Sequence, residues 1–172
     1  MTKLPPECPI EVRFSLSKSL WFDMVFVTGR QGRVVETSDT MWDIGDLFQW
    51  LRGIVRGDGE VTMRIDSEGE VDDVRARYID DKRLHLTIYK GFANDQHPYL
   101  DAVVSRRKLV WEIYYELRKL SLELGNDYRP EKRITDPDWT RLPEVEEWLD
   151  WEKYTNPYSM QDDVTNLERV RD

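Results

Sequence analysis

Residues 60–90 read EVTMRIDSEGEVDDVRARYIDDKRLHLTIYK, and three runs within this stretch alternate between apolar and polar side chains. The apolar positions are Val61, Met63 and Ile65, then Val74, Ala76 and Tyr78, then Leu84, Leu86 and Ile88. Alternation with a period of two is typical of β-strands that bury one face. Ser67-Glu68-Gly69 and Asp80-Asp81-Lys82 separate the runs and are typical of turns, so the stretch predicts an antiparallel meander.

Two or three further strands are expected before this meander. Residues 10–17, IEVRFSLS, alternate in the same way, and residues 20–28, LWFDMVFVT, are apolar at nearly every position, which predicts a central strand. Residues 33–36 are a candidate for a short third strand. A helix is then expected from Ser38-Asp39 to Gly57, because its apolar residues recur at helical spacing. Trp42 and Asp46 lie on the opposite, polar side of this expected helix.

A long helix is predicted over residues 99–124, and it has two apolar stripes instead of one. The second stripe holds Val104, Trp111, Tyr115 and Leu122, while the polar side includes Asp101, Lys108, Glu112, Glu116 and Lys119. The expected cover for the second stripe is the segment 126–172, which is rich in tryptophan and contains a predicted helix over 142–154 with Pro143 in its first turn. A homodimer interface is the competing use, so both a monomer and a homodimer are open.

These patterns predict an α+β fold: one antiparallel sheet of five or six strands, two helices on one face, and a helical C-terminal extension. Residues 1–125 are expected to form the core domain, and residues 126–172 an acidic extension packed on the second long helix.

The charge balance bears on the class of partner. The chain has 34 acidic and 25 basic residues, a formal charge of −9. Because attraction to phosphates depends on Lys and Arg, this balance argues against nucleic acid; it favours a basic protein partner or serves only the solubility of the chain. The single cysteine, Cys8, excludes a disulfide framework. No run of about 18 apolar residues and no signal-peptide pattern occurs, so we expect a cytoplasmic protein without a membrane segment.

No residue pattern indicates catalysis. His85 and His97 are the two histidines, no Gly-x-Ser-x-Gly motif is present, and one Cys with two His cannot supply a tetrahedral zinc site. The adjacent acids Asp72-Asp73 and Asp80-Asp81 are expected in solvated turns. We therefore expect no enzyme activity, no metal and no cofactor.

Two surfaces are candidates for binding. The first is acidic and consists of Trp42, Asp46, Glu144, Glu147 and Asp150, which suit a basic protein partner. The second is the polar face of the sheet, where Arg13, Arg64, Arg75, Arg77 and His85 are expected to project together. Arginine is suited to phosphate, so this face is the alternative, a module for an anionic ligand or nucleic acid. Unpaired arginines favour the second interpretation, and neutralisation by Glu11 and Asp66 favours the first.

The strand IEVRFSLS, the helix DTMWDIGDLFQWLRGIV and the hairpins that end in LHLTIYK give the chain an order of elements that resembles a known class. Within residues 10–125 the chain resembles the small acidic α+β immunity proteins of bacterial polymorphic or contact-dependent toxin systems. The resemblance implies a cytosolic, non-enzymatic protein that occludes the active site of a toxin. The family has no shared motif, so no functional residue is carried over.

Overall fold

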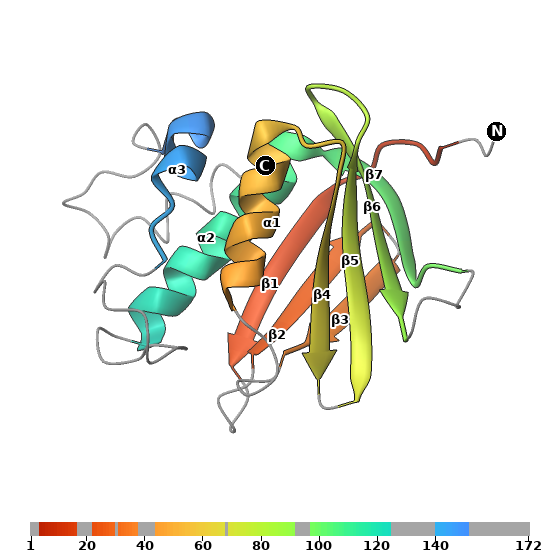
Figure 1. Cartoon of the computed structure of the whole chain (residues 1–172), viewed down its shortest axis with the longest axis horizontal. Helices are drawn as coiled ribbons and strands as arrows, with labels where there is room; N and C mark the ends of the chain where they lie inside the picture. Colours follow the sequence, from red (N-terminus) through yellow and green to blue (C-terminus); the bar gives the residue numbers. More distant parts are fainter. Residues whose placement is uncertain are drawn as a thin grey trace. The chain divides into compact units, whose positions relative to one another are not determined.

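The structure is a computed structural model of the chain, and it describes residues 4–16, 22–29, 31–37, 44–67, 69–91, 97–124 and 140–151. The chain divides into two compact units, residues 1–141 and 142–172. The first unit contains β1 (Ile10–Leu16), β2 (Phe22–Thr28), β3 (Gln31–Glu36), α1 (Ile44–Arg56), β4 (Glu60–Ser67), β5 (Glu70–Tyr78), β6 (Arg83–Lys90), β7 (Leu100–Ser105) and α2 (Arg106–Leu124) (Figure 1). The second unit contains α3 (Pro143–Leu149).

The strands form two antiparallel sheets, one in the order β1-β2-β3 and the other in the order β4-β5-β6-β7. The α+β class, the antiparallel pairing and the central position of β2 are as predicted, but a single sheet of five or six strands is wrong. Alternation identifies each strand without identifying its neighbours, and α1 separates β3 from β4 in the chain. Near β7 a parallel bridge pairs Glu7 with Val103, and the backbone N–H of Cys8 donates to the Val103 carbonyl at 2.9 Å.

The two helices pack on different strands. Helix α1 packs against β4, whereas α2 runs along β1 and also contacts β6, β7 and α1, so both helices contact the four-stranded sheet and α2 also contacts the three-stranded one. The apolar face predicted for α1 is buried, with Ile44, Leu47, Phe48, Leu51 and Ile54 in the core. Gly53 faces β4 so closely that a Cβ there would lie 2.5 Å from Cγ1 of Val61, which explains a glycine inside this helix.

The long helix predicted from residue 99 begins at Arg106, because the preceding residues form β7. Leu100, Ala102 and Val104 alternate into the core and pair with β6, which places Val104 in a strand and not on a helical stripe. The backbone N–H of Lys108 donates to Oγ of Ser105 at 3.3 Å, as expected of a residue that caps a helix N-terminus. His97 therefore lies before β7 and does not cap this helix.

Arg106 ties the start of α2 to the end of α1. Its Nε donates to the Ile54 carbonyl at 3.0 Å and its Nη2 to the Val55 carbonyl at 2.8 Å. A buried guanidinium thus satisfies two carbonyls at the negative end of α1.

In the C-terminal unit, α3 begins with Pro143, as predicted, and ends where Asp150 adopts a left-handed conformation with φ of 53°. It is shorter than the expected helix over 142–154. On α2, the rings of Trp111 and Tyr115 stack with centroids 5.2 Å apart, and Leu122 is exposed. Docking of residues 126–172 on α2 stays a prediction.

Candidate interaction face

The outer face of the four-stranded sheet carries most of the arginines that the sequence singled out. In the register, Asp73 of β5 lies between Arg64 of β4 and Tyr89 of β6. Arg77 of β5 lies opposite His85 of β6. Arg75 lies between them, opposite Thr62 and Thr87. The register therefore gathers four of the five predicted anion-binding residues, Arg64, Arg75, Arg77 and His85, on one face.

Arg13 lies elsewhere, because β1 belongs to the other sheet. Its Nη2 lies 2.5 Å from Oε1 of Glu11, two residues away on the same face of the strand. Glu11 thus pairs within its own strand and not across strands with the arginine face, and the expectation that Arg13 joins the other four residues is wrong.

A buried carboxylate organises the arginine face. Asp73 accepts hydrogen bonds from Nε of Arg64 at 2.9 Å, Nη2 of Arg64 at 3.2 Å and Nη2 of Arg75 at 3.2 Å. Its side chain is 2% exposed, whereas that of Arg64 is 65% exposed. The hydrogen bonds from Arg64 lower the pKa of Asp73 most, and burial opposes them. The guanidinium of Arg75 also lies over the ring of Tyr89, 4.7 Å from its centroid.

This arrangement corrects two expectations. Asp72 and Asp73 lie inside β5 and are buried, and not in a solvated turn. The carboxylate of Asp72 pairs with Nη2 of Arg33 at 3.0 Å, which links β5 to β3 of the other sheet. The neutralising acid on the arginine face is Asp73, because Asp66 instead accepts the backbone N–H of Gly69 within its turn, at 3.1 Å.

His85 is held at both ring nitrogens. Nη2 of Arg77 lies 3.0 Å from Nδ1, and Oδ1 of Asp101 lies 2.6 Å from Nε2. A guanidinium can only donate, so Nδ1 accepts and Nε2 carries the proton that is donated to Asp101. The lone pair that a general base needs is therefore occupied by Arg77.

The acidic candidate residues are distributed over both units. Asp46 is exposed on α1, Trp42 lies outside the described residues, and Glu144, Glu147 and Asp150 are exposed in the C-terminal unit. A common acidic surface formed by these residues stays a prediction.

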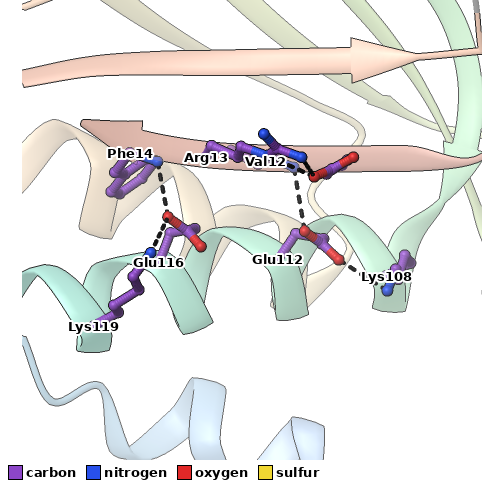
Figure 2. A network of polar contacts seen from close by, with 8 residues as sticks. Val12, Arg13, Phe14, Lys108, Glu112, Glu116 and Lys119 are labelled. Atoms are coloured by element: carbon purple, nitrogen blue, oxygen red, sulfur yellow. Dashed lines mark hydrogen bonds and ion pairs between the residues drawn. The ribbon is translucent and has the colours of Figure 1, made fainter. Parts of the chain in front are cut away.

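A second polar feature, which no sequence pattern indicated, lies along the edge of β1 (Figure 2). Oε2 of Glu112 accepts the backbone N–H of Val12 at 3.2 Å, and Oε2 of Glu116 accepts that of Phe14 at 2.9 Å. Both glutamates are buried, although they were expected on the solvated side of the helix. Lys108 pairs with Glu112 at 2.8 Å. Two acids one helical turn apart thus satisfy the outer edge of β1 and close it to another strand.

Within the described ranges, no three His, Cys, Asp or Glu side chains are grouped so that they could hold a metal ion. None of the helices described is both long and apolar enough to cross a membrane.

Comparison with known proteins gives a distant structural likeness. No protein-family model matches the sequence, and no curated protein matches it. A solved structure described as a CdiA-CT/CdiI toxin and immunity complex from Enterobacter cloacae is similar, with a TM-score of 0.34 and 12% identity. The alignment covers 52% of this chain and 69% of that one.

Proposed function

We propose that this chain is a non-enzymatic, cytoplasmic protein-interaction domain with a basic protein partner, and that it serves as an immunity protein that neutralises a bacterial toxin. The observation that carries the proposal is the pairing of Arg64 and Arg75 with the buried carboxylate of Asp73. The two guanidinium groups share this carboxylate, so the pairing reduces the positive charge that this part of the sheet could offer to a phosphate.

The net charge points in the same direction. With a formal charge of −9, the chain as a whole attracts a basic surface and repels an anionic one. Arginine and tyrosine, fixed in place by Asp73 and by the contact between Arg75 and Tyr89, are residue types that are common in protein interfaces.

Arg77 favours a second candidate function, the binding of an anionic ligand. Among the described residues its polar partner is the imidazole of His85 and not a carboxylate. An anionic group at this end of the face would meet an arginine that lies opposite Glu60 in the register but forms no ion pair among the described residues. Arg77 alone supports anion binding less strongly than the cluster of Arg64, Arg75 and Asp73 supports a protein-interaction role.

Co-expression tests the proposal. The protein encoded beside this chain is expressed in a bacterial host, alone and together with the chain, and growth is measured. We expect arrest in the first case and restored growth in the second, with a 1:1 complex by light scattering. Arg77→Gln is the matched variant: it should leave rescue unchanged if the partner is basic. The proposal would be contradicted if Arg77→Gln no longer restored growth. It would also be contradicted if the stably folded chain neither bound the co-expressed protein nor restored growth.

A further inference from the structure

The outer face of the three-stranded sheet has an apolar centre. On β2, Met24 and Phe26 point into the core, so Val25 and Val27 point outward. Val25 pairs with Val34 of β3, which is 44% exposed. Valine is the residue type that packs well on a pleated surface, and here three of them meet across two strands on the outer side.

Two acids lie directly opposite each other at one end of these valines. Asp23 of β2 pairs with Glu36 of β3 in the sheet register. Like charges in this position destabilise a sheet. No Lys or Arg within the described ranges forms an ion pair with either carboxylate. Burial raises the pKa of Asp23, and the neighbouring charge of Glu36 raises it further.

The remaining charges on this face are already paired. Glu11 and Arg13 of β1 form an ion pair, and their cross-strand neighbours on β2 are Val27 and Val25. The net charge of the described face therefore comes from Asp23 and Glu36. A cation placed beside them would relieve their repulsion, whereas an anion would increase it.

We infer that the valine–acid face, defined as Val25, Val27, Val34, Asp23 and Glu36, is a docking surface for a basic protein segment that presents an apolar side chain beside a lysine or arginine. The inference rests on the proposed function and names the surface and the contact chemistry. The partly exposed valines are covered by the apolar side chain of the partner, and the two carboxylates gain a counter-charge that the described residues do not provide. A second copy of the chain fits less well, because it brings a further Asp23 and Glu36 and its Arg13 is already paired.

An alternating lysine–valine octapeptide is the probe. The full chain, labelled with ¹⁵N, is titrated at an ionic strength of about 0.15 M, where surface charges are screened beyond about 8 Å. We expect the amide shifts to concentrate on β2 and β3. We also expect the peptide to lower the pKa of the Asp23 carboxyl, read from its ¹³C resonance, because bound lysine favours the ionised form.

Two variants and a matched control locate the binding. Glu36→Gln and Val34→Ser should each weaken the affinity several-fold, up to about tenfold, while Glu147→Gln removes an exposed acid from the other unit and should leave it unchanged. Both changes are on exposed strand positions, and the unaltered core is checked from the amide spectrum.

If the peptide shifts amides around Glu147, and Glu147→Gln weakens its binding while Glu36→Gln and Val34→Ser do not, the docking surface is wrong. The proposal of a basic partner would then still hold. A peptide that leaves the Asp23 pKa unchanged would also overturn the surface, as would β2 and β3 amides that shift with protein concentration alone. Failure of the co-expression test with success here would instead contradict only the toxin-neutralising function.

Discussion

Replacing Glu116 with alanine tests the role of the buried acids along β1. The change leaves the N–H of Phe14 without its acceptor, which lies 2.9 Å away in the wild type. An unsatisfied buried donor costs about 1–3 kcal/mol, and hydrogen bonds to charged groups lie in the upper part of that range. Alanine favours the helix slightly and removes a buried charge, which offsets a part of the loss. We expect Glu116→Ala to lower the free energy of unfolding by about 2 kcal/mol.

Glu112 offers a comparison within the same helix. Its bond to the Val12 N–H is longer, at 3.2 Å, but its carboxylate also pairs with Lys108. We expect Glu112→Ala to destabilise by about 1–2 kcal/mol. Glutamine at either position keeps an acceptor oxygen, so each glutamine variant should lose less than half as much as its alanine counterpart.

The assay is urea unfolding followed by tryptophan fluorescence and circular dichroism, together with hydrogen exchange of the Val12 and Phe14 amides. Glu147→Ala, which removes an exposed helical glutamate, is the control. Exchange at Phe14 should accelerate in Glu116→Ala and remain slow in Glu112→Ala. A Glu116→Ala protein within about 0.5 kcal/mol of the wild type, with unchanged Phe14 exchange, would show that Glu116 does not stabilise the edge of β1.

Further predictions concern the core, the arginine face and the C-terminal unit. The pKa of Asp73 is lowered in the folded state, so its ionised form stabilises the protein above about pH 4, and this stability is lost as the pH falls through the folded-state pKa. Asp73→Asn should therefore lower the melting temperature at pH 7 and make the melting temperature depend less on pH on the acid side. An unchanged pH profile of the melting temperature would contradict this. Gly53→Ala should destabilise by about 1–3 kcal/mol in thermal unfolding despite the better helix propensity of alanine, and Gly59→Ala, where a Cβ meets nothing, serves as the control. His85→Ala should leave a hydrolase and nuclease screen with Mg²⁺ or Mn²⁺ as silent as the wild type; wild-type activity that is lost in the variant would reveal an enzyme. Trp148→Ala should lower the melting temperature if residues 126–172 dock on α2, and a fully stable variant would argue against docking.

The strands could be predicted because their evidence is local. Alternation along 10–17, 60–67, 70–78 and 83–90 identifies a buried face in each segment without knowledge of its neighbours. The division into two sheets could not be predicted, because it depends on pairing between segments far apart in the chain. Residues 100–105 show a further limit: Val103 and Val104 suit a helical stripe and a strand equally, and pairing with β6 decides between them.

The arginine face was predictable in part for the same reason. Alternation alone places Arg75 and Arg77 on one side of a strand, and the turn sets Arg64 beside them. Two adjacent acids predict a turn at Asp72-Asp73. However, Arg75 lies two residues further along the same face of β5, and Arg64 of β4 lies opposite Asp73. An arginine at that spacing was the available sign that the carboxylate is paired within a strand.

Glu112 and Glu116 were missed for a different reason. On a helical wheel Glu116 falls between Glu112 and Leu109, and Leu120 and Ile113 follow, so the two acids border the buried face. The two carboxylates accept hydrogen bonds from backbone N–H groups of β1, which lies about 100 positions earlier in the chain. A side-chain pattern does not reveal a backbone donor, so the requirement is visible only in the folded chain.

A comparison of partners of opposite charge under identical conditions shows whether the chain binds a basic protein or an anionic ligand. Fluorescence anisotropy with a labelled lysine–valine octapeptide and a labelled single-stranded oligonucleotide, each titrated with the full chain at about 0.15 M ionic strength, reads the sign of the ligand that the surface accepts. We expect saturable binding of the peptide and no binding of the oligonucleotide. Saturable binding of the oligonucleotide that Arg77→Gln abolishes, with no binding of the peptide, would contradict it.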